Sequence, residues 1–462
     1  MTESTRSESS DVYRRLRDEV VERGLCTHCG TCAGLSGGNI DMVRGGSGPL
    51  PVSQRDDSST LTELAYQACP GLGINYPQLF RWFFDGLPHN WLIGAYRQIF
   101  LGYSLIPRIR RCGSSGGVIT QTLLYLLEND LIDGGIVLQH GSPEAWLSTP
   151  MIARTAEEIE AAAQSVYVPV PVNTILAEVE SFDGRLAYVG LPDQVAAIRQ
   201  LQRLGHAGAK KIEYVIGPYV GTIMYLDSIR SYLRSKCAKK LEDIAELRYR
   251  EGEWPGCLQI KLKSGEILRE NKFYYNYLIP FYLTKSTLLS VDFTNELTDI
   301  SVGDAWNPQL EERGGGFSVV LARTELGSRL LKEMKDRGLL ALDELSLDAA
   351  LAMHGHMLDF KKRGAFIRMA WLRRFGRAVP QYGYAPEHIS IVRKLVEIFI
   401  SGILLAGHSR LARYLVERIP LKLIGPLFDV LRKAWKRISK PTKRSGLRTM
   451  TFRIDPSTQS DR

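Results

Sequence analysis

The chain has 462 residues, of which 44% are hydrophobic and 24% are charged, and its net charge is +9 at pH 7. This composition is ordinary for a globular protein, and the length allows a sizeable core and more than one domain. Binding to nucleic acid is not expected from the positive charge, because no recognition module accompanies it.

The first sixty residues contain three different patterns: a polar stretch, a short helix and an irregular stretch. Residues 1–10, rich in Ser, Thr and Glu, are expected to be disordered. Asp11 is a candidate cap for a short helix over 12–23, which ends at Gly24. Residues 34–60 are rich in Gly, Ser, Pro and Asp, which predicts an irregular excursion of the chain.

Three cysteines follow this helix at intervals of three, Cys26, Cys29 and Cys32, and a fourth stands in the later pair Cys69–Pro70. This spacing is the ligand pattern of a four-iron cluster, because closely spaced thiolates can reach different corners of a cubane. Gly30 allows the backbone turn that wrapping a cluster requires. Two alternatives stay open: a zinc site, which ordinarily uses two separated C-x2-C pairs, and buried cysteines that bind nothing.

The other three cysteines, Cys112, Cys237 and Cys257, are scattered and show no disulfide framework. An odd remainder of thiols argues against secretion and for a reducing cytoplasm. The polar residues 1–20 lack the apolar stretch of a signal peptide, which supports the same location.

Residues 114–117, Ser-Ser-Gly-Gly, precede an apolar helix rich in leucine. Small residues at a helix start leave backbone N–H groups and the positive end of the helix dipole for an anion, such as a flavin pyrophosphate. The alternative is a tight turn that begins a core helix.

Short apolar runs alternate with helical patterns between residues 133 and 237, which predicts an α/β core with helices covering a sheet. After Arg248 the pattern changes to a hairpin around residues 263–265, then to two more strands and a mostly helical region over 320–385. The predicted strands are 133–139, 184–192, 210–221, 298–306 and 316–325, with a hairpin over 257–271 and helices over 155–165, 193–205 and 222–237.

From about residue 386 the composition changes again. Residues 389–407 are apolar but interrupted by Arg393, Lys394 and Glu397, so they are not expected to span a bilayer. The basic run that follows is compatible with a peripheral contact at the inner face of the membrane, with a solvated tail or with a partner-docking helix. It contains Arg432, Lys433, Lys436, Arg437, Lys440, Lys443, Arg444 and Arg448.

Six motifs occur together along the chain: CTHCGTC at 26–32 with Cys69–Pro70, SSGGVIT at 114–120, AQSVYVP at 163–169, VGLPDQVAAIR at 189–199, REGEWPG at 250–256 and DFTNELTDISVGDAW at 292–306. In this order they resemble the coenzyme F420 hydrogenase/dehydrogenase beta-subunit family, which also contains chlorophyll-type reductases of plants and cyanobacteria. The resemblance covers roughly residues 20–380, so the basic C-terminal region lies outside it.

Members of this family are iron–sulfur flavoproteins that pass electrons between clusters, FAD and a partner such as coenzyme F420 or ferredoxin. The resemblance implies a 4Fe–4S cluster on Cys26, Cys29, Cys32 and Cys69. It also implies a flavin site lined by Ser114, Ser115, Gly116, Gly117 and Thr120, with Asp299, Gly303 and Asp304 nearby. For Gly303 and Asp304 the alternative is a turn after a strand.

The chain departs from the family at four positions that ordinarily hold cysteine and would bind a second 4Fe–4S cluster. Carboxylate and hydroxyl groups replace soft thiolates poorly toward iron–sulfur iron, so we expect a single cluster. Val166 also replaces a lysine that relatives often have, which leaves the inherited substrate open. The four substituted positions are Asp193, Val220, Thr287 and Ser290.

Three functions are compatible with these features. The first is an oxidoreductase in which FAD converts single electrons into two-electron chemistry on an unidentified substrate, with Tyr167, Asp299 and Asp193 as candidate catalytic groups. Asp193, a carboxylate in a former cluster pocket, would have a raised pKa, or would be a surface cap without a role. The second is a non-catalytic electron-transfer or docking subunit of a larger redox complex, and the third is a homologue without flavin. We predict the first.

The expected fold is α/β with α+β elements, containing an N-terminal ferredoxin-like cluster segment, a mixed-sheet flavin-binding core and a helical basic C-terminal region. The expected partner is a ferredoxin, coenzyme F420 or a partner subunit. The expected boundaries are an arm with a short helix over 1–24, the cluster segment over 25–100, the core over 101–385 and the basic region over 386–462.

Overall fold

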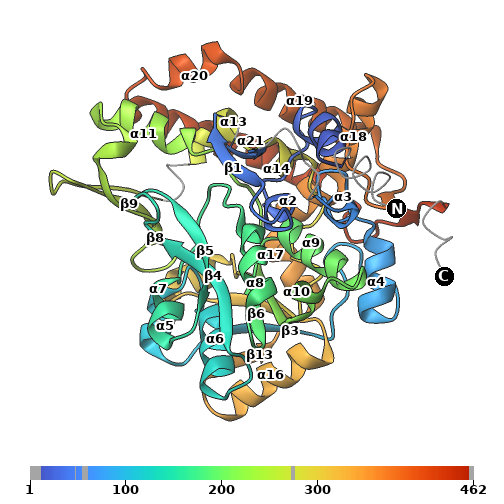
Figure 1. The fold of residues 1–462 in the computed structure, drawn as a ribbon. Helices are drawn as coiled ribbons and strands as arrows, with labels where there is room; N and C mark the ends of the chain where they lie inside the picture. The colour runs from blue at the N-terminus through green and yellow to red at the C-terminus, as the bar shows by residue number, and fades with distance from the viewer. Residues whose placement is uncertain (1–11, 47, 55–60, 272–275, 457–462) are drawn as a thin grey trace.

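An eight-stranded mixed sheet forms the centre of the computed structural model, which describes residues 12–46, 48–54, 61–271 and 276–456 (Figure 1). The strand order is β13 (Leu340–Glu344), β3 (Gln98–Ser104), β12 (Ser318–Ala322), β11 (Ile300–Asp304), β7 (Ile212–Pro218), β6 (Leu186–Val189), β4 (Gly134–His140) and β5 (Ser148–Ala153). The neighbours β11, β7, β6 and β4 run parallel, whereas both ends of the sheet are antiparallel. The predicted α/β fold with a mixed sheet is confirmed.

Helices cover both faces of this sheet. The helices α6 (Val118–Glu128) and α16 (Glu325–Asp336) pack on one face, and α9 (Pro192–Arg203) packs on the other. Successive strand residues supply the two cores in turn, Val215 to one and Ile216 to the other, because side chains alternate along a strand. The parallel strands therefore read as nearly continuous apolar runs, which is why the sequence predicted them.

The N-terminal segment differs from its prediction. Residues 12–16 are α-helical and continue into a π-helical turn over Arg17–Val21, as expected, whereas residues 1–11 lie outside the described residues. The irregular excursion expected over 34–60 was wrong, because Ile40–Gly45 (β1) and Gly48–Ser53 (β2) form an antiparallel hairpin. The Tyr13 hydroxyl accepts a hydrogen bond from the Ser53 backbone N–H at 3.0 Å, which fastens the hairpin to the first helix.

A second sheet of three antiparallel strands consists of β8 (Ile244–Glu251), β9 (Cys257–Leu262) and β10 (Ile267–Asn271). Its β9–β10 hairpin was predicted and is confirmed, whereas β3 and β13 were missed. Up to residue 385, the other helices among the described residues are α2 (Thr31–Gly34), α3 (Glu63–Gln67), α4 (Tyr76–Phe84), α5 (Pro107–Cys112), α7 (Ala156–Ala161), α8 (Leu176–Ser181), α10 (Ala207–Lys210), α11 (Asp227–Cys237), α13 (Ile279–Tyr282), α14 (Lys285–Leu289), α15 (Pro308–Arg313), α17 (Leu347–Asp359) and α18 (Ala365–Arg374), with short helical turns at Val172–Ile175, Leu241–Asp243, Asn276–Leu278 and Phe360–Gly364.

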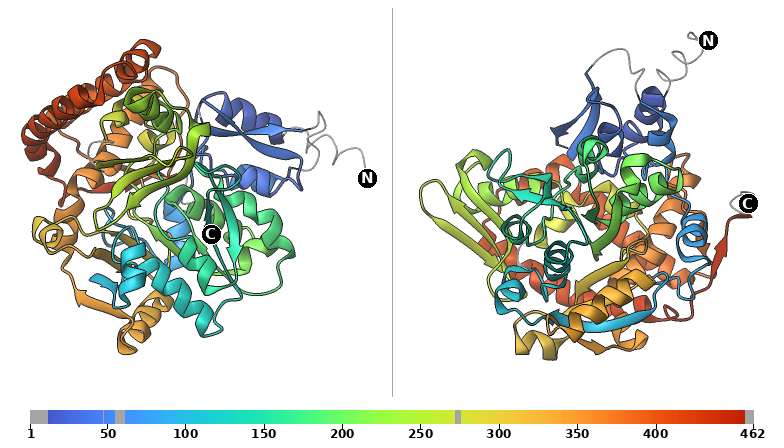
Figure 2. Two further views of the ribbon diagram at one scale, coloured as in Figure 1. Left: turned by 90° about the vertical axis from the view of Figure 1, so that its left-hand side faces the viewer. Right: turned by 60° about the horizontal axis from the view of Figure 1, so that its bottom comes forward.

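The C-terminal region adds helices to the outside of the body, and the left view of Figure 2 shows them in orange and red. They are α19 (Ile391–Gly407), α20 (Arg410–Val416) and α21 (Leu421–Arg444), and the chain then returns to pair β15 (Phe452–Ile454) with β14 (Tyr384–Pro386). Within the described residues, no helix combines the length and the apolar character needed to cross a membrane.

Candidate functional site

Four cysteines from two segments of the chain line one recess. Cys26, Cys29 and Cys32 come from the loop after the first helix, and Cys69 comes from the turn after α3. Burial raises the pKa of the Cys26 thiol to about 12, and burial together with the other three thiols raises that of Cys32 well above its usual value. Without a bound metal, the thiols therefore stay protonated at neutral pH.

The loop that carries three of these cysteines is held in one shape by its neighbours. His28 and Gly30 have positive φ angles of 63° and 86°. A Cβ atom on Gly30 would lie only 2.8 Å from the carbonyl oxygen of Pro171. The Cys29 carbonyl accepts a hydrogen bond from the Asn173 N–H at 2.8 Å, and the His28 N–H lies 3.4 Å from the Cys26 sulfur.

The donor set in this recess fits an iron–sulfur cluster. Four soft sulfur donors surround one space, and backbone N–H groups lie next to the sulfurs of Cys26, Cys32 and Cys69. A cubane carries its irons at separate corners, so its four ligands need not converge on one point. Among the described residues, no three His, Cys, Asp or Glu side chains are arranged to hold a single metal ion.

A buried arginine joins three of the residues that the sequence assigned to the site. Arg250, at the end of β8, is only 3% exposed. Its guanidinium pairs with the Asp304 carboxylate at 3.0 Å, donates to the Tyr167 hydroxyl at 2.9 Å and donates to the Ser114 carbonyl. The Trp254 indole N–H also donates to Asp304, at 2.8 Å. Residues from four separate motifs thus meet at the carboxyl end of β11.

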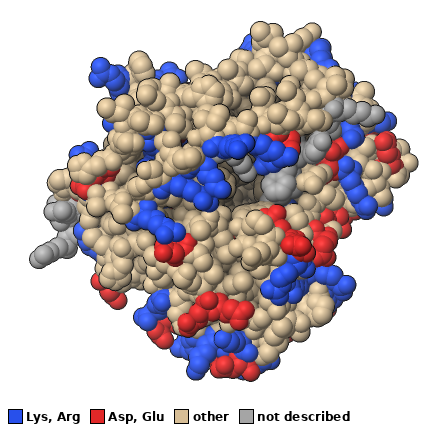
Figure 3. All heavy atoms as spheres, turned by 180° about the vertical axis from the view of Figure 1, so that it is seen from behind, with Lys and Arg blue, Asp and Glu red and all other residues tan. Residues whose placement is uncertain are grey.

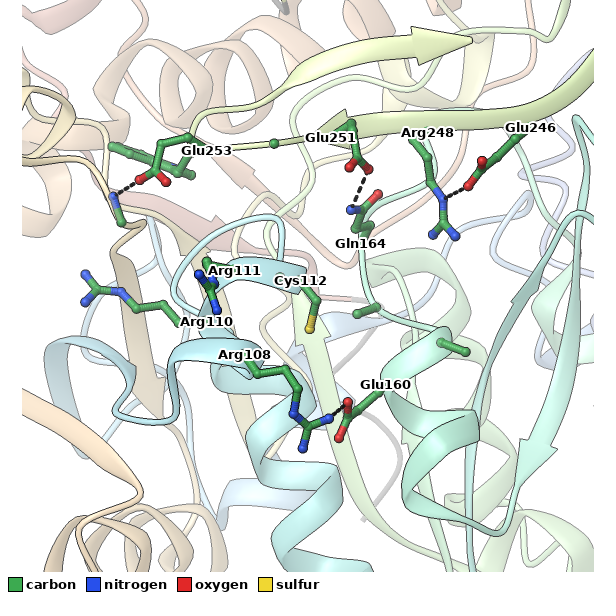
Figure 4. Close-up of a pocket in the computed structure, with 16 residues that line it drawn as sticks. Arg108, Arg110, Arg111, Cys112, Glu160, Gln164, Glu246, Arg248, Glu251 and Glu253 are labelled. Atoms are coloured by element: carbon green, nitrogen blue, oxygen red, sulfur yellow. Dashed lines mark hydrogen bonds and ion pairs between the residues drawn. The ribbon is translucent and has the colours of Figure 1, made fainter. Parts of the chain in front are cut away.

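A cavity of about 560 Å³ lies beside this arginine, within the range of roughly 300–1,000 Å³ that small-molecule sites occupy. Figure 4 shows that one wall carries the arginines of α5, and that the glutamates at the end of β8 lie opposite. Glu160 pairs with Arg108, and Glu246 pairs with Arg248 at 2.9 Å. The principal charged lining residues are Arg108, Arg110, Arg111, Glu160, Glu246, Arg248, Glu251 and Glu253.

The glycine-rich turn predicted to bind flavin lies next to this cavity and is packed closely against the sheet. The preceding Gly113 lines the cavity. The Ser115 hydroxyl donates to the Phe317 carbonyl at 2.9 Å, and the Gly116 N–H donates to the Ser318 hydroxyl at 2.9 Å. Gly117 has a φ angle of 74° where α6 begins. These contacts account for the small residues of the turn by close packing alone. Thr120 lies buried on α6.

The predicted residues of the DISVGD stretch lie at two different places. Asp299 precedes β11 and Asp304 ends it, so five residue steps along the strand separate them by roughly 17 Å. The Asp299 carboxylate is buried and pairs with Arg199 at 2.8 Å.

A Cβ atom on Gly303 would lie 2.2 Å from the Tyr219 ring, so this glycine makes room for that ring. The structure therefore brings Asp304 to Tyr167 and leaves Asp299 at the opposite end of the strand.

Asp193, at the start of α9, shares its pocket with a lysine that the sequence did not single out. Lys361 is 1% exposed, and its ammonium donates to the Thr287 carbonyl on α14 at 3.0 Å. Burial raises the pKa of the Asp193 carboxyl to about 6, although Lys361 lowers it in part. Burial lowers the pKa of Lys361 to about 8, although Asp193 opposes that shift. The Lys361 ammonium therefore lies on the Thr287 carbonyl, and the Asp193 carboxyl interacts electrostatically with that ammonium.

Sequence reasoning missed several residues around the cavity. Arg250 entered the sequence argument only as the first residue of the REGEWPG motif, although it hydrogen-bonds to Ser114, Tyr167 and Asp304. The arginine run over 108–111 precedes the Ser-Ser-Gly-Gly turn and was a usable signal for an anion. Gly314, Gly315 and Gly316 all have positive φ angles, and Gly315 lies against Arg110 at the cavity wall.

Two family models match the chain. The N-terminal part of the coenzyme F420 hydrogenase/dehydrogenase beta subunit matches residues 99–177, and its C terminus matches residues 183–347. Together they cover more than half of the 462 residues. The chain belongs to the coenzyme F420 hydrogenase/dehydrogenase beta-subunit family. This is a family of coenzyme F420-linked oxidoreductases, as the sequence motifs predicted.

Relatives within the family are distant. The chain is 24% identical to the coenzyme F420-dependent sulfite reductase of Methanocaldococcus jannaschii, over 84% of this chain and 61% of that protein, and so spans less than two thirds of its length. It is 25% identical to the coenzyme F420 hydrogenase subunit beta of Methanothermobacter thermautotrophicus, over 54% of this chain and 84% of that protein. A chain of the F420-reducing [NiFe] hydrogenase complex from Methanosarcina barkeri shares the fold, with a TM-score of 0.51 and 20% identity, over 63% of this chain and 98% of that chain.

Proposed function

We propose that this protein is an iron–sulfur flavoprotein oxidoreductase of the cytoplasm. It passes electrons between one 4Fe–4S cluster, FAD and an external donor or acceptor such as coenzyme F420 or ferredoxin, and so reduces or oxidises a substrate. We also propose the division into a ferredoxin-like cluster segment over 25–100, a flavin-binding core over 101–385 and a basic helical region over 386–462. The observation that carries the proposal is the continuous packing between the cysteine recess and the arginine-lined cavity.

This continuity rests on one short segment of chain. The Tyr225 ring packs edge-on against His28 of the cysteine loop, with 6.0 Å between the ring centroids. The preceding residue, Met224, donates its backbone N–H to the Tyr167 carbonyl at 3.1 Å. The Tyr167 hydroxyl in turn accepts a hydrogen bond from Arg250. Bonded and packed groups therefore connect the cysteine loop to Arg250, whose neighbours Glu251 and Trp254 line the cavity.

The cysteine recess and the arginine-lined cavity each have residues suited to one cofactor. Cys26, Cys29, Cys32 and Cys69 would hold the cluster as thiolates. The α5 arginines and the residue 114–117 turn, with Thr120, Gly303 and Asp304 near it, would bind the flavin and its pyrophosphate, since arginine forks match phosphate oxygens. When bound, the flavin supplies the conversion between single-electron and two-electron transfer.

The chain's own side chains would position the cofactor and supply protons. Arg250 fixes the position of the Tyr167 hydroxyl through a hydrogen bond of 2.9 Å, and Tyr167 is our candidate proton donor. Asp193 has a pKa of about 6 and is a second candidate for acid–base chemistry. We assign Asp299 to the fold, because Arg199, the Val215 N–H and Thr324 all bind its carboxylate.

The proposal of a single cluster rests on the residues that occupy the place of the family's second 4Fe–4S cluster. Where the family has cysteines, this chain has Asp193, Val220, Thr287 and Ser290. The Thr287 side chain accepts a hydrogen bond from the Ile223 N–H at 3.2 Å, and the Lys361 ammonium lies on its carbonyl. A cation and hard oxygen donors do not fit iron–sulfur iron.

A second candidate function is a non-catalytic electron-transfer or docking subunit of a larger redox complex. The likeness in fold to a chain of a hydrogenase complex favours it. In that case the cavity would bind the flavin, while the substrate would react on a partner.

Anaerobic purification followed by iron, sulfide and flavin quantitation tests these proposals. We expect about four irons and one FAD per chain, since one cubane contains four irons. About eight irons would contradict the single cluster, and four irons without flavin would favour the subunit function. Reduction of the bound flavin by reduced coenzyme F420 or by reduced ferredoxin then identifies the electron donor.

A further inference from the structure

The helix α19 is attached to the body through charged residues and shows its apolar side to the outside. Arg393 is fully buried, and its guanidinium pairs with Asp359 at 2.8 Å and with Glu397 at 2.7 Å. Glu397 also pairs with Arg368 of α18. A surface helix ordinarily buries apolar side chains and exposes charged ones, so this helix has the opposite arrangement.

The outward side of α19 is a continuous apolar stripe. Ile391, Leu395, Ile398 and Leu405 are all exposed, Leu405 by 78%. Their spacing of four, three and seven residues places them on one face of the helix. Isolated exposed leucines are common on protein surfaces, but a complete apolar helix face of this kind marks an interaction site.

The other two helices extend this stripe. On α21 Leu423, Leu427, Leu431 and Ile438 are exposed, Ile438 by 72%, and on α20 Leu411 is exposed by 68%. The Phe399 and Trp435 rings pack with 4.9 Å between their centroids and fasten α19 to α21. We call the exposed apolar side chains of α19, α20 and α21 the outer apolar face.

Basic side chains border the outer apolar face. Lys433, Arg437, Lys440 and Arg444 are exposed on α21 at spacings of four, three and four residues, which sets them as a stripe beside the apolar one. In Figure 3 the upper part of the molecule, where Figure 1 places α19 and α20, is mostly uncharged surface with Lys and Arg at its margins.

The acidic residues of this region are already bound to cations. Between residues 391 and 448 the acids are Glu397, Glu417 and Asp429. Glu397 is buried between two arginines, Glu417 pairs with Arg234 at 3.0 Å and Asp429 pairs with Lys433 at 2.7 Å. The border of the outer apolar face is therefore cationic.

We propose that the outer apolar face lies in the plane of an anionic lipid surface, with the apolar side chains among the acyl chains and the basic stripe against the headgroups. This inference goes beyond the proposed function and does not depend on the cluster or the flavin. Apolar side chains on one side of a helix, next to lysine and arginine, suit binding in the interface plane. A second copy of the chain fits less well, because a two-fold interface would bring two basic stripes toward each other.

Flotation with lipid vesicles tests this proposal on the full, cofactor-loaded chain. One set of vesicles contains phosphatidylcholine alone, and the other contains phosphatidylcholine mixed with phosphatidylglycerol. We expect binding to the anionic vesicles, weakened by salt, and a loss of about fivefold in partitioning for each basic side chain neutralised. The charge variant is Arg437→Gln/Lys440→Gln/Arg444→Gln, and the apolar variant is Leu395→Gln/Leu405→Gln/Ile438→Gln.

Matched controls replace exposed residues elsewhere. Ile267→Gln on β10 is the apolar control, and Lys263→Gln/Lys332→Gln/Lys335→Gln is the charge control; both should float like the wild type. An unchanged midpoint of urea unfolding shows that each variant folds. If the apolar variant does not fold, the charge variant alone tests the proposal. The proposal is overturned if the wild type stays with neither vesicle set, if neither variant weakens flotation, or if the apolar variant only converts a dimer to a monomer.

Discussion

Arg250 and Asp304 form an ion pair of 3.0 Å that joins the three-stranded sheet to the carboxyl end of β11. Arg250 also donates to the carbonyl of Pro255 at 2.6 Å, in the turn that follows its own strand. One guanidinium thus fixes β8, the turn after it, the Tyr167 loop and the start of the glycine-rich turn. Arginine suits this position because its planar fork supplies several donors in fixed directions.

Replacing Arg250 by methionine is expected to lower the free energy of unfolding by about 3 kcal/mol, because it leaves the Asp304 carboxylate without its cation. Arg250→Lys keeps the charge but not the fork, and should lose about half as much. Urea unfolding and flavin content measure both effects. Arg269→Met on exposed β10 is the control and should change stability by less than about 0.5 kcal/mol. An Arg250→Met protein that unfolds like the wild type would falsify this assignment.

Replacing any one of the four recess cysteines by serine is expected to lower iron content by more than half, because a hard hydroxyl binds iron–sulfur iron poorly. Iron and sulfide quantitation on Cys32→Ser and Cys69→Ser measures this loss. Cys237→Ser on α11, away from the recess, is the matched control and should keep its full iron content. If Cys69→Ser also keeps it, the fourth ligand is not Cys69.

The sequence predicted those strands and helices whose local residue pattern is sufficient to specify them. Apolar runs identified β4, β6, β7, β11 and β12, and the Lys-Ser-Gly turn identified the β9–β10 hairpin. The hairpin β1–β2 was missed because Gly and Pro are frequent in it, and its pairing is supported by Tyr13, far away in the sequence. Contacts between distant residues leave no local pattern.

The same limit applies to the site. The cysteine spacing predicted which residues would share a recess, because three of the four are close in sequence. Asp299 and Asp304 were placed together because they share a motif, yet the rise of a strand separates them. The meeting of Ser114, Tyr167 and Asp304 depends on Arg250, whose role only the fold reveals.

Gly30→Ala is expected to lower stability by about 3 kcal/mol. A left-handed alanine costs about 1–2 kcal/mol, and its Cβ atom would also press on the Pro171 carbonyl and on Thr174. Gly37→Ala separates these causes, since Gly37 has a φ angle of 59° and no atom within 4 Å of its Cβ position. Gly37→Ala should therefore lose only the conformational part. Equal losses in urea unfolding would show that close packing at Gly30 contributes nothing.

The pair of Asp193 and Lys361 is expected to reduce stability most between about pH 6 and pH 8. Burial raises the pKa of Asp193 from 3.8 to about 6, so its neutral form stabilises the fold fully below 3.8 and this contribution is lost as the pH rises to 6. Burial lowers the pKa of Lys361 from 10.5 to about 8, so its neutral form stabilises the fold above 10.5 and this contribution is lost as the pH falls to 8. Between these values both groups are charged, with Lys361 fully buried and Asp193 partly buried.

The variant Asp193→Asn/Lys361→Gln removes both charges while keeping a donor for the Thr287 carbonyl. It should raise the free energy of unfolding by about 1–2 kcal/mol at neutral pH, and by less on either side of this window. Lys361→Gln alone should be less stable than the wild type near neutral pH, because Asp193 then lacks its cation. Anaerobic urea unfolding at about pH 5, 7 and 9 measures these differences. A double variant whose difference from the wild type is the same at all three pH values would show that neither group titrates in the fold.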